Sequence, residues 1–322
     1  GDLLICEGGD TGRCAIWTSD KPIYYQNALH RVRFYDDINN RFVMYILHYY
    51  KRTGIIDKLS HGQTIKHFTQ KGLNQLVFNI PTFNIQQSIA SELDAIQKMI
   101  DGYNAQIVDL DSLAQSIFLD MFGDIVNNER RWNFKKFGSL ASSINYGTSS
   151  PAVDGGKYKY LRMGNITDNG HLDFQDMKYI DIPDNEIEKY IVRKGDILFN
   201  RTNSREKVGK TACFMEDENM VIAGYIIRVR LNEMKTLPIY VAQAFNTPKM
   251  KAHLRKLARG SVGQANINSK ELSNIEISVP PIELQQLFAS KFEVIEQQKE
   301  QIRLQLKDAE TLMAERMQYY FS

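Results

Sequence analysis

The chain has 322 residues, of which 43% are hydrophobic and 24% are charged. This composition excludes an intrinsically disordered chain, and no apolar run approaches the roughly 18 residues of a membrane span. The 40 Lys and Arg against 38 Asp and Glu give a formal net charge of +2, which excludes a strongly basic histone-like protein but not a local basic patch.

Cysteine usage predicts a cytoplasmic protein. Cys6, Cys14 and Cys213 are too few and too unevenly placed for a disulfide framework, and no CxxC pair indicates a structural zinc site. The chain begins with glycine and shows no signal-peptide pattern. We therefore expect reduced thiols and no membrane partner.

Taken in chain order, the first elements recur later in the sequence. The segment GDLL at Gly1 parallels GDIL at Gly195, and HRVRF (30–34) parallels IRVRL (227–231). The most extended match, at an offset of 199, joins IPTFNIQQSIASELDAI (80–96) to VPPIELQQLFASKFEVI (279–295). Such self-similarity indicates two repeats, each a mixed domain followed by a long helix. The first repeat is predicted to lack the equivalent of residues 124–194 and so to be truncated.

The repeats predict four segments and a mixed α/β (α+β) fold. Residues 1–80 would be the C-terminal part of a first domain, 81–123 a first spacer helix, 124–279 a complete second domain and 280–322 a second spacer helix. Within the second domain, the runs KYKYLRMGNI, DILFNR and YIIRVRL have the composition of short strands, whereas PIYVAQAFNTPKMKAHLRKLAR is typical of a helix. Arg228 and Arg230 alternate with apolar residues, which favours the outer face of a strand.

The two spacer helices carry coiled-coil seams. Apolar residues alternate at spacings of four and three from Ile89 to Met121, and again from Phe288 to Tyr320 with Lys299 and Arg316 as interruptions. Both helices follow a proline, which is favourable at a helix start. The simplest arrangement is an antiparallel pair within the chain, and the alternative is an intermolecular coiled coil that forms a dimer.

Motifs for catalysis are absent from the sequence. It contains no H-E-x-x-H, G-x-S-x-G, kinase or amino-methyltransferase motif, and the six histidines have no metal-ligand spacing. The stretch SREKVGKT (204–211) ends like a P-loop but lacks its first glycine and continues as a predicted strand. We therefore expect no catalytic residues, no metal and no cofactor in this chain.

Charge is unevenly distributed along the chain. Residues 193–264 hold fourteen Lys and Arg against six Asp and Glu, a net of +8, whereas the spacer helices at 82–123 and 281–322 carry −5 and −2. Basic residues mixed with Asn, Gln, Ser and Thr suit DNA, because basic groups position phosphates and polar side chains recognise base edges. The predicted DNA-binding residues are Tyr146, Thr148, Ser149, Arg162, Asn165, Arg201, Asn203, Ser204, Lys207, Lys210, Arg259, Ser261, Gln264 and Asn266 in the second domain, with Arg13, Gln63 and Lys66 in the first.

Several of these motifs together resemble the specificity subunit of type I restriction–modification systems. The resemblance rests on YLRMGNI (160–166), on GDILFNRTNS (195–204) followed by VGKTACF (208–214), and on GSVGQANINSKELSNIEISVPPIELQQ (260–286), together with the two long helices. Parts of this set recur in the same order in the first repeat, and the resemblance covers essentially the whole chain.

The resemblance implies a non-catalytic protein with two target-recognition domains joined by an antiparallel helical pair. Each domain would recognise one half of a split, asymmetric double-stranded DNA sequence. The implied partners are two modification subunits, which hold S-adenosylmethionine and methylate adenine, and restriction subunits, which hydrolyse ATP with Mg²⁺ and cleave DNA. Two other classes remain open: a coiled-coil scaffold whose mixed domains bind proteins, and a stand-alone enzyme with an unrecognised site.

Overall fold

The computed structural model describes residues 1–62, 66–260 and 263–322 and divides into two compact units. Unit 1 comprises residues 1–108 and 299–322, and unit 2 comprises residues 109–298. The two long helices, α4 (Phe83–Phe122) and α9 (Ile282–Phe321), therefore each contribute one part to each unit. Within the described residues, no helix combines the length and the apolar character that a membrane crossing requires.

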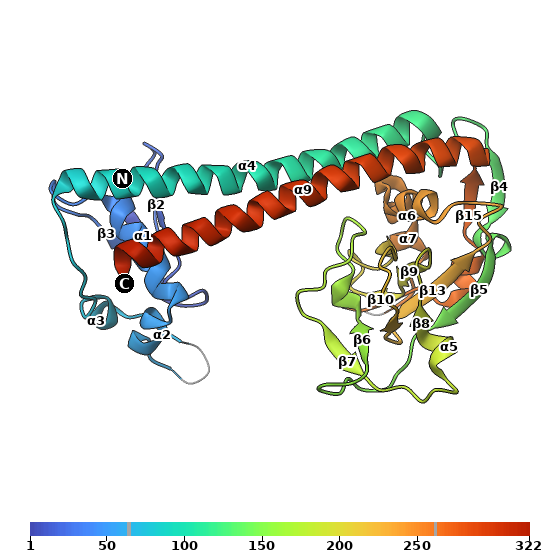
Figure 1. The fold of residues 1–322 in the computed structure, drawn as a ribbon, viewed down its shortest axis with the longest axis horizontal. Helices are drawn as coiled ribbons and strands as arrows, with labels where there is room; N and C mark the ends of the chain where they lie inside the picture. The colour runs from blue at the N-terminus through green and yellow to red at the C-terminus, as the bar shows by residue number, and fades with distance from the viewer. Residues whose placement is uncertain (63–65, 261–262) are drawn as a thin grey trace. The chain divides into compact units, whose positions relative to one another are not determined.

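Unit 1 consists of a small antiparallel sheet, short helices and the outer parts of α4 and α9 (Figure 1). The sheet has the order β2-β1-β3, and Leu3 of β1 pairs with both Ile16 and Val32. The elements before α4 are β1 (Leu3–Cys6), β2 (Cys14–Ile16), β3 (Leu29–Val32), α1 (Asn40–Arg52), α2 (Ile55–Leu59) and α3 (Gln70–Leu73).

Unit 2 contains two four-stranded sheets and two two-stranded ladders. One sheet has the antiparallel order β11-β9-β13-β5, and the other has the order β7-β6-β12-β8 with β6 and β12 parallel. The strands are β4 (Asn133–Lys136), β5 (Ala141–Tyr146), β6 (Tyr158–Leu161), β7 (Lys178–Ile180), β8 (Ile191–Val192), β9 (Ile197–Asn200), β10 (Thr202–Asn203), β11 (Thr211–Cys213), β12 (Met220–Ile222), β13 (Ile226–Leu231), β14 (Ala265–Asn266) and β15 (Glu276–Val279).

Short helices cover these sheets, and one predicted helix is divided in two. The helices are η1 (Phe137–Leu140), η2 (Met163–Asn165), α5 (Ile187–Tyr190), α6 (Pro238–Asn246), α7 (Pro248–Leu257) and α8 (Ser269–Ser273). The stretch predicted as one helix from Pro238 breaks at Thr247, which is extended because a proline follows it. The Thr247 hydroxyl then caps α7 by accepting a hydrogen bond from the backbone of Met250.

The predicted repeat is visible in the strand order. β1, β2 and β3 of unit 1 have the same sequential and spatial order as β9, β11 and β13 of unit 2, with the strand that follows the Gly-Asp pair at the centre of the three. The strands predicted within KYKYLRMGNI, DILFNR and YIIRVRL are confirmed as β6, β9 and β13.

The mixed fold with an antiparallel helical pair is confirmed. In unit 2, the C-terminal end of α4 meets the N-terminal end of α9 (Figure 1). There, Phe118 and Phe122 pack edge-on against Phe288, and both also contact Tyr240 of α6. In unit 1, the N-terminal part of α4 packs against the C-terminal part of α9 in one apolar cluster. The helices thus pair within one chain, and the intermolecular alternative is not needed to bury their seams.

Polar contacts fix the helical register in unit 1. Arg316, expected only to interrupt the seam, forms an ion pair with Glu92 of α4, and the Tyr320 hydroxyl donates to the same carboxylate at 2.6 Å. The next residue of α9 after Arg316, Met317, is buried and belongs to the apolar cluster of unit 1. Hydrogen bonds from Arg316 and Tyr320 hold the pKa of Glu92 below its ordinary value of 4.5.

A buried glutamine attaches each long helix to the domain that precedes it. Gln285 is fully buried; its carbonyl accepts from the backbone N–H of Leu237 at 2.8 Å and from the Thr236 hydroxyl at 3.1 Å, while its amide donates to the Pro280 carbonyl at 2.8 Å. Gln86 occupies the matching place in unit 1. It accepts from the N–H of Asn39 at 2.9 Å and donates to the carbonyl of Pro81 at 2.8 Å.

Replacing Gln285 with leucine should lower the free energy of unfolding by about 2–4 kcal/mol, because the buried N–H, hydroxyl and carbonyl groups lose their partner without access to water. Urea unfolding monitored by circular dichroism measures this difference. The neighbouring Gln286 is exposed, so Gln286→Leu is the matched control and should change the free energy by less than about 0.5 kcal/mol. Equal effects of the two variants would contradict this role of Gln285.

The Glu92 contacts predict a pH dependence. Because the pKa of Glu92 is lowered in the folded protein, its ionised carboxylate stabilises the fold fully at a pH above the ordinary pKa of 4.5. This stabilisation is lost as the pH falls through the lowered pKa. Glu92→Gln should therefore be less stable than the wild type at pH 7, and the difference should shrink steadily below pH 4.5. Urea unfolding of both proteins across this range tests it, and a difference that does not vary with pH would contradict it.

Candidate nucleic-acid interface

A cavity in unit 2 has a volume of about 940 Å³, and we call it the recognition pocket. Its walls come from the segment after β5 (146–152), from η2 and the loop at 173–176, and from the ends of β9 and β12. Six of the seventeen predicted residues line it: Tyr146, Thr148, Ser149, Arg162, Asn165 and Arg201. The fold thus brings together residues from three separate sequence motifs.

Close backbone contacts hold the segment after β5 against the end of β12. Gly147 lies so near this strand that a Cβ atom would come within 2.3 Å of the Ile222 and Ala223 carbonyl oxygens. The next residue, Thr148, donates its N–H to Ile222 and accepts from the N–H of Gly224. Only glycine permits the first approach, so this wall of the pocket has a fixed position.

Arg201 is oriented by two contacts at the pocket wall. Its guanidinium carbon lies 4.7 Å from the centre of the Tyr146 ring, and its Nη1 donates to the Gly224 carbonyl at 3.2 Å. The Tyr146 hydroxyl is held in turn by Ser269, to whose side-chain oxygen it donates at 2.9 Å and from whose backbone it accepts at 2.8 Å. The Nε of Arg201 is buried and has no hydrogen-bond partner among the described residues.

A second arginine that lines the pocket has a different environment. Arg162 donates from Nη2 to the carboxylate and to the carbonyl of Asp176, both at 2.8 Å, and this contact holds the pKa of Asp176 below its ordinary value. Asn165 is almost fully buried; its side chain accepts from the Arg162 N–H and donates to the Asp173 carbonyl, each at 2.8 Å. Asn165 therefore holds the pocket wall in place.

The remaining predicted residues of unit 2 continue from the pocket along a two-stranded ladder. Asn203 of β10 pairs with Ala265 of β14, and Asn266 exchanges two backbone hydrogen bonds with Arg259. The Arg259 side chain is 84% exposed and forms an ion pair with Glu271 at 2.8 Å. Gln264 is exposed and Ser204 begins the adjoining turn, whereas Ser261 lies outside the described residues.

The lysines at 207 and 210 have different environments. The Lys207 side chain is 56% exposed, with its ammonium 3.9 Å from Asp168. Lys210, expected at the DNA surface, lies inside unit 2, where its ammonium donates to the Ile166 carbonyl and where burial lowers its pKa. Its position gives it a contact within the domain in place of an exposed charge.

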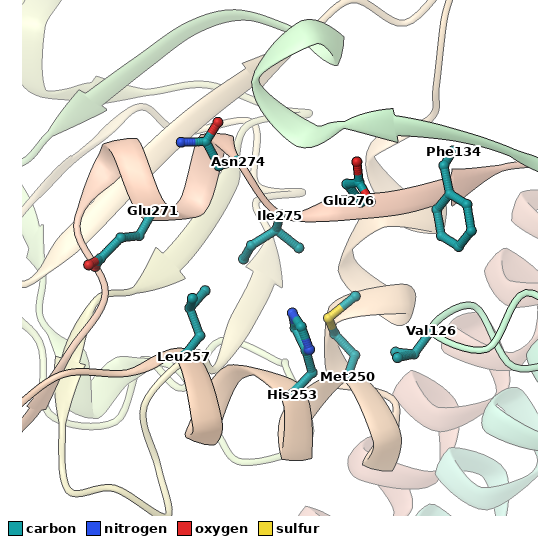
Figure 2. Close-up of a pocket in the computed structure, with 9 residues that line it drawn as sticks. All are labelled: Val126, Phe134, Met250, His253, Leu257, Glu271, Asn274, Ile275 and Glu276. Carbon is teal, nitrogen blue, oxygen red and sulfur yellow. The ribbon is translucent and has the colours of Figure 1, made fainter.

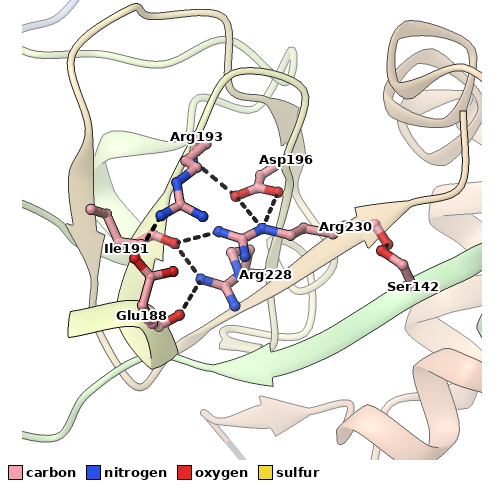
Figure 3. Close-up of polar contacts among 7 residues, drawn as sticks. All are labelled: Ser142, Glu188, Ile191, Arg193, Asp196, Arg228 and Arg230. Carbon is pink, nitrogen blue, oxygen red and sulfur yellow. Dashed lines mark hydrogen bonds and ion pairs between the residues drawn. The ribbon is translucent and has the colours of Figure 1, made fainter. Parts of the chain in front are cut away.

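The alternating arginines of β13 are both held by polar contacts within unit 2 (Figure 3). Arg228, expected on an outer face, is 2% exposed and donates to the carbonyls of Ile191 and Glu188. Arg230 donates to Asp196 at 3.1 Å and to the same Ile191 carbonyl. The expectation of an outer strand face was wrong for Arg228, because α5 and β8 supply carbonyl acceptors above it, whereas the Arg230 side chain remains 26% exposed.

Unit 1 contains only three of the residues predicted to bind DNA. Arg13 is exposed beside Asp10, and Lys66 forms an ion pair with Asp57 at 3.2 Å. The Thr11 hydroxyl donates to the Lys66 carbonyl, which brings the two segments together. Gln63 lies outside the described residues.

A second cavity has a volume of about 400 Å³ (Figure 2). It lies between α7 and β15, with Met250, Leu257 and Ile275 among its apolar residues and His253, Glu271 and Glu276 among its polar ones. Each cavity has two carboxylates on its walls, but only the recognition pocket also has two arginines, which can bind a polyanion. The recognition pocket is therefore the better candidate for nucleic acid.

Sequence patterns did not identify several pocket residues. Tyr225 is 52% exposed and Met163 is 41% exposed at the cavity, and Asp173, Gln175 and Asp176 complete one wall. They lie in loops or a single short turn, without periodicity or a motif of their own. The available signals were that Met163 falls within YLRMGNI and that Tyr225 begins YIIRVRL.

The chain resembles known proteins over most of its length. Residues 1–109 and 129–309 match the family described as the type I restriction modification DNA specificity domain. The chain is 24% identical over 270 residues to the type I restriction enzyme EcoKI specificity subunit of Escherichia coli K12, covering 79% of this chain and 58% of that protein. It is 29% identical over 161 residues to the putative MjaX specificity subunit of Methanocaldococcus jannaschii, covering 49% and 38%.

The chain thus spans less than two thirds of the length of these two curated relatives. Among solved structures, the S subunit of a type I restriction–modification system from M. genitalium has a TM-score of 0.57 at 15% identity, covering 100% of this chain and 83% of that one. A chain from work on complex assembly and conformational transition of the type I R-M system has a TM-score of 0.53 at 15% identity, covering 98% and 80%. These likenesses concern the fold, and the family match shows that the chain belongs to the type I restriction–modification DNA specificity family.

Proposed function

We propose that this chain is a DNA-binding specificity subunit and that unit 2 recognises one half of a split DNA target. The observation that carries the proposal is the recognition pocket, where two arginines and a tyrosine from separate motifs meet in a protein of the specificity family. The scaffold alternative is not favoured, because the relatives are named restriction-enzyme specificity subunits.

The pocket suits recognition of base edges. Stacking on Tyr146 and the hydrogen bond to Gly224 fix the plane of the Arg201 guanidinium, so less side-chain entropy is lost on binding. A fixed guanidinium can donate two parallel hydrogen bonds to O6 and N7 of guanine. Arg259 and Lys207, exposed along the adjoining ladder and turn, would contact phosphates and set the orientation of the duplex.

In this proposal, catalysis belongs to partner subunits. Modification subunits would bind S-adenosylmethionine and methylate the target, and restriction subunits would use ATP and Mg²⁺ to cleave DNA. The specificity chain would bring both to the same sequence in the cytoplasm. Two modification subunits per chain, as expected from the resemblance, are part of the proposal.

Arg201→Lys should weaken binding to the preferred DNA sequence by about 10- to 100-fold, because lysine cannot form the bidentate, stacked arrangement. Binding to unrelated duplex DNA should change little. The preferred sequence is first selected from a random duplex library by the chain with its modification subunit, and fluorescence anisotropy then measures affinity. Arg193→Lys is the matched control, since Arg193 is paired with Glu188 and does not line the pocket. Unchanged specificity in Arg201→Lys would exclude this assignment.

Variants of the exposed Lys207 and of the buried Lys210 should differ in how their DNA affinity depends on salt concentration. Lys207→Ala or Arg259→Ala should reduce the slope of log affinity against log salt by about one unit if each side chain contacts one phosphate. The control is Lys194→Ala, because Lys194 precedes the start of β9, at the end away from Arg201, and forms an ion pair with Asp217. Lys210→Met should instead lower the melting temperature and leave the slope unchanged, because Lys210 is buried. Equal slopes for all four variants and the wild type would contradict the assigned phosphate contacts.

A further inference from the structure

Three side chains with metal-binding groups converge in unit 2, away from the residues that line the recognition pocket. Asp111 lies on α4, His171 on the loop before Leu172, and Glu296 on α9. One potential ligand atom from each lies within 4.8 Å of the other two. Across the described ranges 1–62, 66–260 and 263–322, this is the one such group of His, Cys, Asp or Glu.

The histidine is held in place by its own loop. Its backbone N–H donates to the Thr167 hydroxyl at 3.0 Å, and its carbonyl accepts from the Thr167 N–H at 2.9 Å. Gly170 adopts a φ of +82° inside this loop, and a Cβ there would come within 2.6 Å of the Thr211 carbonyl. The loop therefore has little freedom, and the His171 ring is presented to the helices from a fixed backbone.

The aspartate is oriented in the same way. Oδ1 of Asp111 lies 3.1 Å from Nε2 of His171, and its Oδ2 accepts from the Asn169 amide at 3.2 Å. The Asn169 contact comes from outside the group, and hydrogen bonds of that kind orient ligating carboxylates in metal sites. The His171 and Asp111 side chains are 26% and 21% exposed, which leaves access for an ion from solvent while reducing competition from bulk water.

We propose that Asp111, His171 and Glu296 bind one divalent transition-metal ion of the Zn²⁺ type. One imidazole nitrogen and two carboxylate oxygens suit Zn²⁺ and Co²⁺, whereas Mg²⁺ and Ca²⁺ prefer oxygen ligands alone. Two ligands on one ion lie at most about 4.2 Å apart, twice a bond of about 2.1 Å. Movement of the side-chain ends by less than an ångström is therefore enough to close the group around an ion.

The ion would connect the pocket wall to both long helices within unit 2. His171 lies between Ile166 and Leu172, which form a bridge, and this hairpin leads directly to Asn165 and Asp173 of the recognition pocket. The Asp173 N–H donates to the Asn165 carbonyl at 2.8 Å. Fixing the hairpin to α4 and α9 would stabilise that wall. The metal proposal itself does not depend on DNA binding.

Calorimetric titration of the metal-free full-length chain with Zn²⁺ tests the proposal. One ion per chain should bind, and His171→Ala should weaken this binding by at least about 30-fold through loss of a ligand. Asp111→Asn and Glu296→Gln should each weaken it by at least about 10-fold.

Two controls separate this site from others. His253→Ala removes an exposed histidine of α7 outside the group and should leave Zn²⁺ affinity unchanged. Titration with Co²⁺ should give visible absorption without a thiolate charge-transfer band, which excludes binding by Cys6, Cys14 or Cys213. Zn²⁺ affinity that is the same in wild type and His171→Ala, or a thiolate band with Co²⁺, would overturn the proposal. Neither titration contains DNA, so a negative result would count against the metal site and not against the proposed DNA-binding function.

Discussion

The attachment of each long helix to the domain before it depends on one buried glutamine. Gln86 and Gln285 each connect the first turns of a spacer helix with the backbone at the start of a domain helix, α1 or α6. An amide is suited to this position because it can accept and donate at once without a buried charge. The same residue performs the same task in both units, so the repeat conserves the attachment as well as the elements. In unit 2, the aromatic cluster around Phe288 then packs against a helix whose start is already fixed.

Net charge along the sequence was an imperfect guide to the basic surface. The +8 of residues 193–264 includes Arg228 and Lys210, which are buried and donate to backbone carbonyls, and Arg230, which is paired with Asp196. All three donate to backbone carbonyls of neighbouring segments and so stabilise the interior of unit 2. The exposed basic residues that remain, such as Lys207 and Arg259, are fewer and lie beside the recognition pocket. A small, placed set of charges suits selective recognition better than a uniform basic surface.

The repeat, the strands and the two helices could be predicted because local periodicity and self-similarity determine them. The Ile89–Met121 seam predicted α4, and the break at Thr247 had a visible signal in Pro248, which cannot continue the hydrogen bonding of α6. The pocket could be predicted only in part. The Tyr146–Ser269 contact joins residues 123 positions apart, and no local pattern encodes such a pairing. The burial of Arg228 depended on α5 and β8 covering β13, which strand alternation alone cannot show.

The separation between pocket residues and attachment residues bears on how specificity can change. Gln285, Phe288 and Tyr240 connect the helices to unit 2 without lining the recognition pocket, whereas Tyr146, Arg162 and Arg201 line it without contacting that attachment. If the pocket binds DNA as proposed, substitutions in it would alter base preference while the helical pairing stays intact. The hairpin that carries His171 is the exception, because it contacts α4 through Asp111 and leads to the pocket wall at Asn165 and Asp173. Changes in this hairpin should affect both stability and recognition, so it is the least tolerant of the loops that form the site.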